Sequence, residues 1–210
     1  MADLRHRPGS AGFRSLNIAM GLVGLAAFGM LYATQPLLPR LSERFGVDAT
    51  AASLSVSVTT GALAVLVVPA TWLGSRIGRR RTIRIGLVAA VGLTLACAVA
   101  PTFPVLLGLR AATGAALAAV VGVAMGHVAA EVHPSGLASA MGFYVAGNSL
   151  GGVTGRLVAS VAVDLTDWRW ALAALGALAL ASTAAFLRLL PATVANIPPP
   201  PPAPATAAPV

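Results

Sequence analysis

One arginine, Arg110, lies within a long apolar stretch of the chain, four residues before Gly114. A guanidinium stays protonated at physiological pH and is costly to place in hydrocarbon, so this side chain must face the protein interior or water. Charged groups inside membrane segments are functional candidates by default, which makes Arg110 a candidate functional residue. The alternative is a structural arginine that binds backbone carbonyls of the first apolar stretch.

Three uncharged polar residues are candidates for contact with a small-molecule substrate in a largely apolar cavity: Tyr32, Gln35 and Asn148. Each of them is equally well explained as a bridge between helices, because polar side chains commonly serve that purpose in membranes. The sequence has no metal-ligand spacing and no cofactor motif. We therefore expect neither a metal nor a cofactor.

A glycine-rich stretch contains Gly147, Gly151, Gly152 and Gly155. Gly147, Gly151 and Gly155 recur every four residues and so share one face of a helix, which permits close packing against another helix. The same letters match the G-x-S-x-G pattern of serine hydrolases, with Ser149 as the nucleophile. That function requires a strand, a sharp turn and a nearby histidine, so an intramembrane serine protease is the least favoured hypothesis and we expect no enzyme.

Proton-carrying groups are missing from the middle of the apolar stretches. The six acids lie at or near their ends: Asp3, Glu43, Asp48, Glu131, Asp164 and Asp167. His127 and His133 come at the end of a stretch, where solvated loop residues are expected. Because arginine does not release its proton, a proton-driven carrier needs a titrating group that these stretches do not supply.

The composition explains why all these residues must be placed by membrane helices. Of 210 residues, 57% are hydrophobic and only 10% are charged, whereas soluble domains have about a quarter charged. Crossing the hydrocarbon requires about 20 apolar residues. Six stretches are long enough: Leu16–Leu38, Ala49–Leu73, Ile83–Pro101, Phe103–Met125, Gly136–Val163 and Trp168–Leu190.

The second stretch contains a local alternation of polar and apolar residues over 53–60 that is typical of a strand. A lone strand would leave its backbone groups unpaired in hydrocarbon, so we predict a helix here as well. The serines and threonines are expected to face protein or a wet cavity. In the first stretch, Pro36 and Pro39 are expected to bend or end the helix.

The arginines predict the orientation of the bundle. All fourteen basic residues are arginine; nine lie on the side of the N-terminus, three on the other side, and Arg110 and Arg156 lie inside the stretches. Cytoplasmic loops carry the excess of basic residues, so both termini are predicted to be cytoplasmic. The net charge of +8 therefore reflects membrane topology, and little soluble surface is left to bind nucleic acid.

The short basic loop after the second stretch carries a family signature. Residues 71–80 resemble the loop signature of the major facilitator superfamily, Gly-x-Leu-Ala-Asp-Arg-x-Gly-Arg-Arg, through Arg76, Gly78, Arg79 and Arg80. Thr71 replaces the first glycine and Ser75 replaces the aspartate. In the family this acid is thought to latch the cytoplasmic gate. Because a neutral hydrogen bond is weaker than a charge-assisted one, we expect a weaker latch here.

Further signatures follow in the order of the same family. Arg110 with Gly114 resembles its intramembrane arginine motif, which implies a role in coupling to protons, and 147–152 resembles its antiporter signature with Asn148 in place of proline. Residues 32–39 and the polar second stretch are similar to the YnfM-like branch of bacterial drug/proton antiporters. Together the resemblance covers roughly residues 13–190.

The resemblance implies an all-α membrane protein whose six transmembrane helices form one half of a twelve-span carrier. We expect a basic cytoplasmic tail over 1–15, the half-transporter bundle over 16–190 and a disordered Pro/Ala-rich tail over 191–210. The expected function is export of small amphipathic compounds from a bacterium across its inner membrane in exchange for protons. A truncated or split carrier should be inactive unless it forms a homodimer or binds a second half. The alternative is a six-span interaction or regulatory protein that does not transport.

Overall fold

A computed structural model describes residues 5–191 of the chain. Within this range the protein forms six long α-helices, joined by short turns and by one further short helix, α2, and two 3-10 turns. The long helices are α1 (Ala11–Leu31), α3 (Ala49–Ile77), α4 (Arg79–Cys97), α5 (Phe103–Glu131), α6 (Leu137–Leu165) and α7 (Trp168–Leu189). Of the predicted tail over 191–210, residues 192–210 lie outside the described residues.

The first helix ends earlier than predicted. α1 stops at Leu31, and the chain continues through a 3-10 turn, η1 (Gln35–Leu37), into the short helix α2 (Leu38–Phe45). Pro36 and Pro39 lie in the first turns of these two elements, where a missing N–H group costs nothing. The break expected from the prolines is therefore present, but it begins before the first of them.

Four segments of residues 5–191 are long and apolar enough to cross a membrane by composition alone: Ala11–Phe45, α3, α5 and α7. The remaining two long helices are less apolar, since α4 begins with a run of arginines and α6 is rich in glycine. Both are nevertheless packed among the spanning helices, α4 against α5 and α7, and α6 against α1 and α7. The bundle is thus made of six helices, as the sequence predicts.

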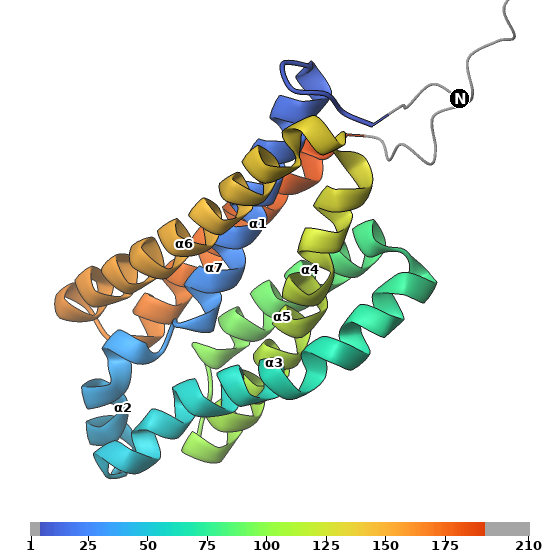
Figure 1. The fold of residues 1–210 in the computed structure, drawn as a ribbon. Helices are drawn as coiled ribbons and strands as arrows, with labels where there is room; N and C mark the ends of the chain where they lie inside the picture. Colours follow the sequence, from blue (N-terminus) through green and yellow to red (C-terminus); the bar gives the residue numbers. More distant parts are fainter. Residues whose placement is uncertain (1–4, 192–210) are drawn as a thin grey trace, which may run out of the picture.

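The helices form two groups, α1 with α6 and α7, and α3 with α4 and α5 (Figure 1). The most extensive contacts join α1 to α6 and α3 to α5. The first long helix thus pairs with the fifth, and the second with the fourth, as in two three-helix repeats related by a pseudo-two-fold axis. α1 is the most enclosed of the spanning segments and lies at the centre of the apolar core.

Hydrogen bonds bring the described ends of the chain to the same end of the bundle. The His6 amide donates to the carbonyl of Glu131 at 2.8 Å, the Ser15 hydroxyl donates to the carbonyl of Leu189, and Arg80 donates to the carbonyl of Leu190 at 3.0 Å. We call this the arginine-rich end, because it holds Arg5, Arg7, Arg14, Arg76, Arg79, Arg80, Arg81, Arg84 and Arg188.

The polar stretch of the second long helix is helical, as predicted from the need to pair its backbone. Within α3, Ser53, Ser57 and Thr59 each donate a hydrogen bond to a carbonyl three or four residues earlier. Ser55 and Thr59 are buried. The Thr59 hydroxyl is thus paired within the helix that carries it, whereas the buried Ser55 hydroxyl has no hydrogen-bond partner among the described residues.

Candidate substrate and coupling site

Arg110 is completely buried and binds backbone carbonyls of two other helices. Its Nε donates to the carbonyl of Ser55 at 3.1 Å, and its two terminal nitrogens donate to the carbonyls of Met30 at 2.9 Å and Leu31 at 2.7 Å. The side chain has no exposed surface. The sequence left two roles open for Arg110, in coupling or in structure. In this conformation it has the structural arrangement, since it binds backbone carbonyls of the first apolar stretch.

The end of α1 explains why these carbonyls accept an arginine. The last four carbonyls of a helix have no partner within it, and the helix dipole places partial negative charge there. Met30 and Leu31 are the last two residues of α1, immediately before the break at Tyr32. Arg110 supplies both hydrogen-bond donors and a compensating positive charge at this buried helix end.

A second arginine within a long helix, Arg156 in α6, also lies beside the end of α1. Its Nε donates to Oε1 of Gln35 at 2.7 Å, and its guanidinium carbon lies 4.7 Å from the centre of the Tyr32 ring. We call Tyr32, Gln35 and Arg156 the Arg156 cluster. Two of the three predicted substrate residues are thus brought together, by an arginine that sequence reasoning used only to count charges.

Arg156 differs from Arg110 in what its charge contacts. The side chain is half-buried, and within residues 5–191 its two terminal nitrogens form neither a hydrogen bond nor an ion pair. Its position inside a long helix was the signal that could have identified it, because a charge at such depth needs a partner or water.

Asn148, the third predicted substrate residue, lies apart from the Arg156 cluster. It is two turns before Arg156 on α6, about 12 Å along the helix axis. Its side-chain oxygen packs against Gly24 of α1 and is buried without a hydrogen-bond partner in the described part of the chain. This position fits a helix contact better than a shared site with Tyr32 and Gln35.

The glycines predicted for helix packing lie mostly where α1 and α6 meet. A Cβ at Gly147 would collide with the Gly21 carbonyl, one at Gly151 would lie 2.5 Å from the Leu25 carbonyl, and one at Gly155 would lie 2.7 Å from Gly29. This face is therefore occupied inside the bundle and is not available to a partner protein. Gly114 makes an equally close contact with the Thr59 carbonyl of α3.

Gly152 lies outside this close contact. A Cβ there would meet Tyr32 and Arg156 at 3.8 Å, which is ordinary van der Waals contact. Gly152 thus borders the Arg156 cluster and has room for a methyl group.

The basic loop residues do not contact one another across helices. The Ser75 hydroxyl donates to the Trp72 carbonyl at 2.6 Å within α3, and the Arg76 guanidinium lies 4.3 Å from the centre of the Trp72 ring. Gly78 ends α3 with a φ of +94°, a conformation that L side chains rarely adopt. Arg79 is exposed beside Gly126 of α5, while Arg80 binds the Leu190 carbonyl after α7.

The serine of the hydrolase-like pattern lies in a continuous helix. Ser149 is exposed in the middle of α6, and its hydroxyl donates to the carbonyl of Val145 at 3.3 Å. The strand and sharp turn that would expose a nucleophile are not formed at this position. The geometry gives no support to the protease hypothesis.

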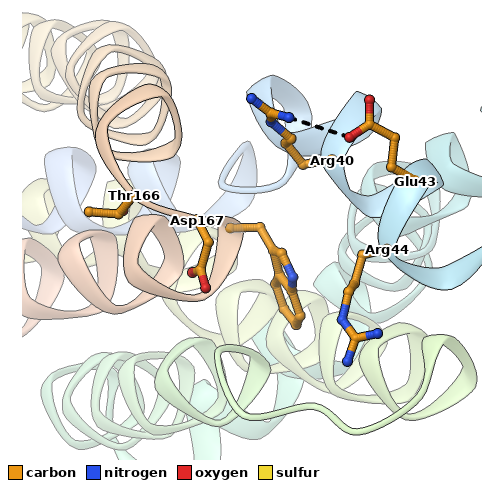
Figure 2. Close-up of a pocket in the computed structure, with 6 residues that line it drawn as sticks. Arg40, Glu43, Arg44, Thr166 and Asp167 are labelled. Carbon is orange, nitrogen blue, oxygen red and sulfur yellow. Dashed lines mark hydrogen bonds and ion pairs between the residues drawn. The ribbon is translucent and has the colours of Figure 1, made fainter.

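A polar groove of about 360 Å³ lies at the other end of the bundle, between α2 and the start of α7. Figure 2 shows Arg40 directed toward Glu43, with which it forms an ion pair at 3.4 Å, and Arg44 directed away from both. Asp167 accepts hydrogen bonds from the first amides of α7. The groove is thus lined by an exposed ion pair and a helix cap rather than by converging groups.

The comparisons with known proteins agree with this architecture. Residues 20–210 match the sequence profile of the Major Facilitator Superfamily. The chain is 39% identical over 183 residues to the inner membrane transport protein YnfM of Escherichia coli, covering 87% of this chain and 44% of that protein. It is 38% identical to the uncharacterized MFS-type transporter YybF of Bacillus subtilis, over 88% of this chain and 46% of that one.

Two further similarities are more distant. The multidrug resistance protein Stp of Mycobacterium tuberculosis is 30% identical over 72% of this chain and 28% of its own length. A bacterial homologue of the human lysosomal transporter Spinster, in an inward-facing conformation, has the same fold, with a TM-score of 0.68 at 18% identity over 86% of this chain and 43% of that chain.

The chain spans less than half the length of these transporters. The match to YnfM extends over 183 of the 210 residues and therefore includes the basic loop, Arg110 and the glycine-rich helix. The chain belongs to the major facilitator superfamily of membrane transporters.

Proposed function

We propose that this chain is one half of a bacterial inner-membrane transporter that exports small amphipathic compounds in exchange for protons. The Arg156 cluster carries the proposal. It brings a half-buried charged side chain together with the half-buried Tyr32 and the exposed Gln35 beside the end of α1, and it leaves the charge accessible. A carrier needs such a group within the membrane, where a substrate can reach it. The name of the multidrug resistance relative supports an amphipathic substrate.

The proposal includes a second six-helix bundle, either another copy of this chain or a separate chain. α3 and α6 leave large side chains on the outside of the bundle: Val65, Val68, Trp72, Leu150, Val153, Leu157 and Val161. Ser57 and Ser149 are exposed on the same two helices, and polar groups facing lipid are unfavourable. A partner bundle packed on α3 and α6 would cover these surfaces and complete a central cavity.

The proposed orientation places the arginine-rich end in the cytoplasm. This end holds nine of the fourteen arginines, and cytoplasmic segments carry such an excess. The other end holds Arg40, Arg44 and Arg169 together with four acids, Glu43, Asp48, Asp164 and Asp167.

Proton coupling requires a titrating group, and we propose that the partner bundle supplies it. Glu131 is the acid nearest the core of the described bundle, and it lies in the last turn of α5 at the arginine-rich end. Arg110 would act in coupling by exchanging its carbonyl partners when the bundles move, since its own proton is not released.

A dye-export experiment tests the proposed function. We expect cells that express the chain to lose a preloaded fluorescent amphipathic dye when they are energised, and an uncoupler of the proton gradient to stop the loss. Loss that persists with the uncoupler would contradict proton exchange. Transport by a reconstituted monomer, verified as such by crosslinking, would contradict the requirement for a second bundle. A chain that moves no dye in any assembled form would favour the interaction-protein alternative.

Restoring the family's acid in the basic loop is predicted to strengthen the cytoplasmic gate. In the assembled transporter we expect Ser75→Asp to slow the labelling of a cysteine introduced at Ser139, an exposed position near the start of α6. A charge-assisted hydrogen bond is worth about 1 kcal/mol more than a neutral one. If it stabilises the closed state of the gate by that amount, the cysteine is accessible about fivefold less often and is labelled about fivefold more slowly. The native Cys97 is buried and leaves the reporter as the reactive thiol.

Ser75→Asn is the matched control, because it adds similar volume without charge. Equal labelling rates in the aspartate and asparagine variants would show that charge at this position does not act on the gate.

A further inference from the structure

The Arg156 cluster has the composition of an anion site rather than of a general polar patch. A guanidinium presents two parallel N–H groups on its terminal nitrogens, a geometry that matches a carboxylate or a similar oxyanion. In Arg156 these two nitrogens are the ones that make no hydrogen bond within residues 5–191, while Nε is committed to Gln35 at 2.7 Å. The donors suited to an anion are thus the ones left available.

The neighbouring side chains hold the guanidinium in place. Gln35 fixes one edge through its Oε1, and the Tyr32 ring lies under the charge at 4.7 Å. A cation stacked on an aromatic ring and bonded at one edge loses little further freedom when it binds a ligand. Gly152 borders the cluster, and a side chain there would contact both Tyr32 and Arg156.

The two arginines beside the end of α1 differ in how far the protein compensates their positive charge. Arg110 is fully buried, and each of its three side-chain nitrogens donates to a carbonyl. Arg156 is half-buried, and none of the acids in the described part of the chain forms an ion pair with it. A charge about nine residues, or roughly 13 Å, inside the end of α6 is costly without a counter-charge.

We infer that the Arg156 cluster binds the anionic group of an amphipathic organic acid, such as a carboxylate or sulfonate, and that Arg156 determines this specificity. The inference rests on the proposed transport function and names its substrate class. Tyr32 would contact the apolar part of the compound next to the charged group, and Gln35 would hold the guanidinium toward it. A lipid phosphate offers the same oxyanion chemistry, so the experiment must separate the two sources.

Direct binding to the purified full chain in phosphatidylcholine nanodiscs tests the inference without requiring transport. The probe is dansyl-aminoundecanoic acid, and its methyl ester is the neutral comparison. We expect the acid to bind about tenfold more tightly than the ester. Arg156→Gln should remove this preference, and Arg156→Lys should retain part of it, because an ammonium keeps the charge without the paired N–H groups.

Arg169→Gln is the matched control. Arg169 is also half-buried and also lies 4.7 Å from the centre of an aromatic ring, that of Trp168, but it is in the first turn of α7. This variant should keep the full preference for the acid. Circular dichroism on every variant checks that the helices remain formed.

Three results would overturn the inference. These are equal binding of acid and ester by the native chain, a preference that survives Arg156→Gln, and acid binding that phosphatidylglycerol in the nanodisc abolishes, since a net-anionic lipid headgroup would then fill the site. A chain that binds the acid selectively but exports no dye would separate this result from the transport proposal, which would fail on its own.

Discussion

Replacing Arg110 with methionine is expected to lower the free energy of unfolding by about 2 to 3 kcal/mol. Methionine fills a similar volume but donates no hydrogen bond, so the carbonyls of Met30, Leu31 and Ser55 lose a charged donor. The Leu31 carbonyl is the most affected, because the Met30 carbonyl also accepts from Ala33 and the Ser55 carbonyl from Thr59. Unfolding in sodium dodecyl sulfate, followed by circular dichroism, measures the change.

Two further variants separate hydrogen bonding from charge. Arg110→Lys keeps the positive charge but reaches fewer carbonyls, so its stability should lie between those of the native chain and the methionine variant. Arg44→Met is the control, since Arg44 is exposed at the other end of the bundle. If Arg110→Met unfolds at the same detergent fraction as the control, Arg110 has no structural role.

Adding one methyl group to the α1–α6 contact is expected to have an effect of similar size. Gly147→Ala and Gly151→Ala should each lower the free energy of unfolding by about 1 to 3 kcal/mol, the usual cost of overpacking. The new methyl groups would press on the backbone carbonyls of Gly21 and Leu25, which cannot rotate away as a side chain can. The same detergent titration measures both variants.

The same helix provides the controls. A Cβ at Gly142 meets nothing within 4 Å, so Gly142→Ala should be neutral or stabilise the helix by up to about 1 kcal/mol. Gly152→Ala should also be tolerated, because its contacts are at 3.8 Å. If the two contact variants and the two controls all changed the free energy of unfolding by the same amount, α1 and α6 would not be in backbone contact.

The fold was largely predictable because hydrocarbon thickness restricts both the length and the composition of a span. Five of the six long helices begin within four residues of the predicted stretches. The errors have a physical origin, since a helix does not stop where its side chains become polar. α3 continues to Ile77 and α4 begins at Arg79, so both extend through the arginines that were expected to form a loop.

The end of α1 was harder to place. A 3-10 hydrogen bond from Ala33 to Met30 tightens the chain before Pro36, and Arg110 binds the carbonyls left over. The first of these hydrogen bonds is local, but the second depends on a residue of another helix about 80 positions away. No local pattern in the sequence encodes such a pairing.

The candidate site was predicted only in part for the same reason. Tyr32 and Gln35 were identified from their polarity, but their common partner, Arg156, is more than 120 positions further along the chain. Asn148 has the same chemical character and lies on the same helix as Arg156, yet it packs on Gly24 in the helix contact. Residue type shows that a polar group needs a partner, and only the packing of α1 on α6 determines which partner it has.

The pairing of α1 with α6 also has a consequence for biosynthesis. The glycine surface of α6 is translated roughly 125 residues after its counterpart on α1, which at about 5–20 residues per second is a delay on the order of ten seconds. For that interval the α1 surface around Gly21, Leu25 and Gly29 is covered by lipid or by the insertion machinery instead of by α6. When α6 packs on α1, it must displace that lipid or insertion machinery. During the same interval, α1 can also pair with the identical α6 of another copy that is translated from the same messenger RNA.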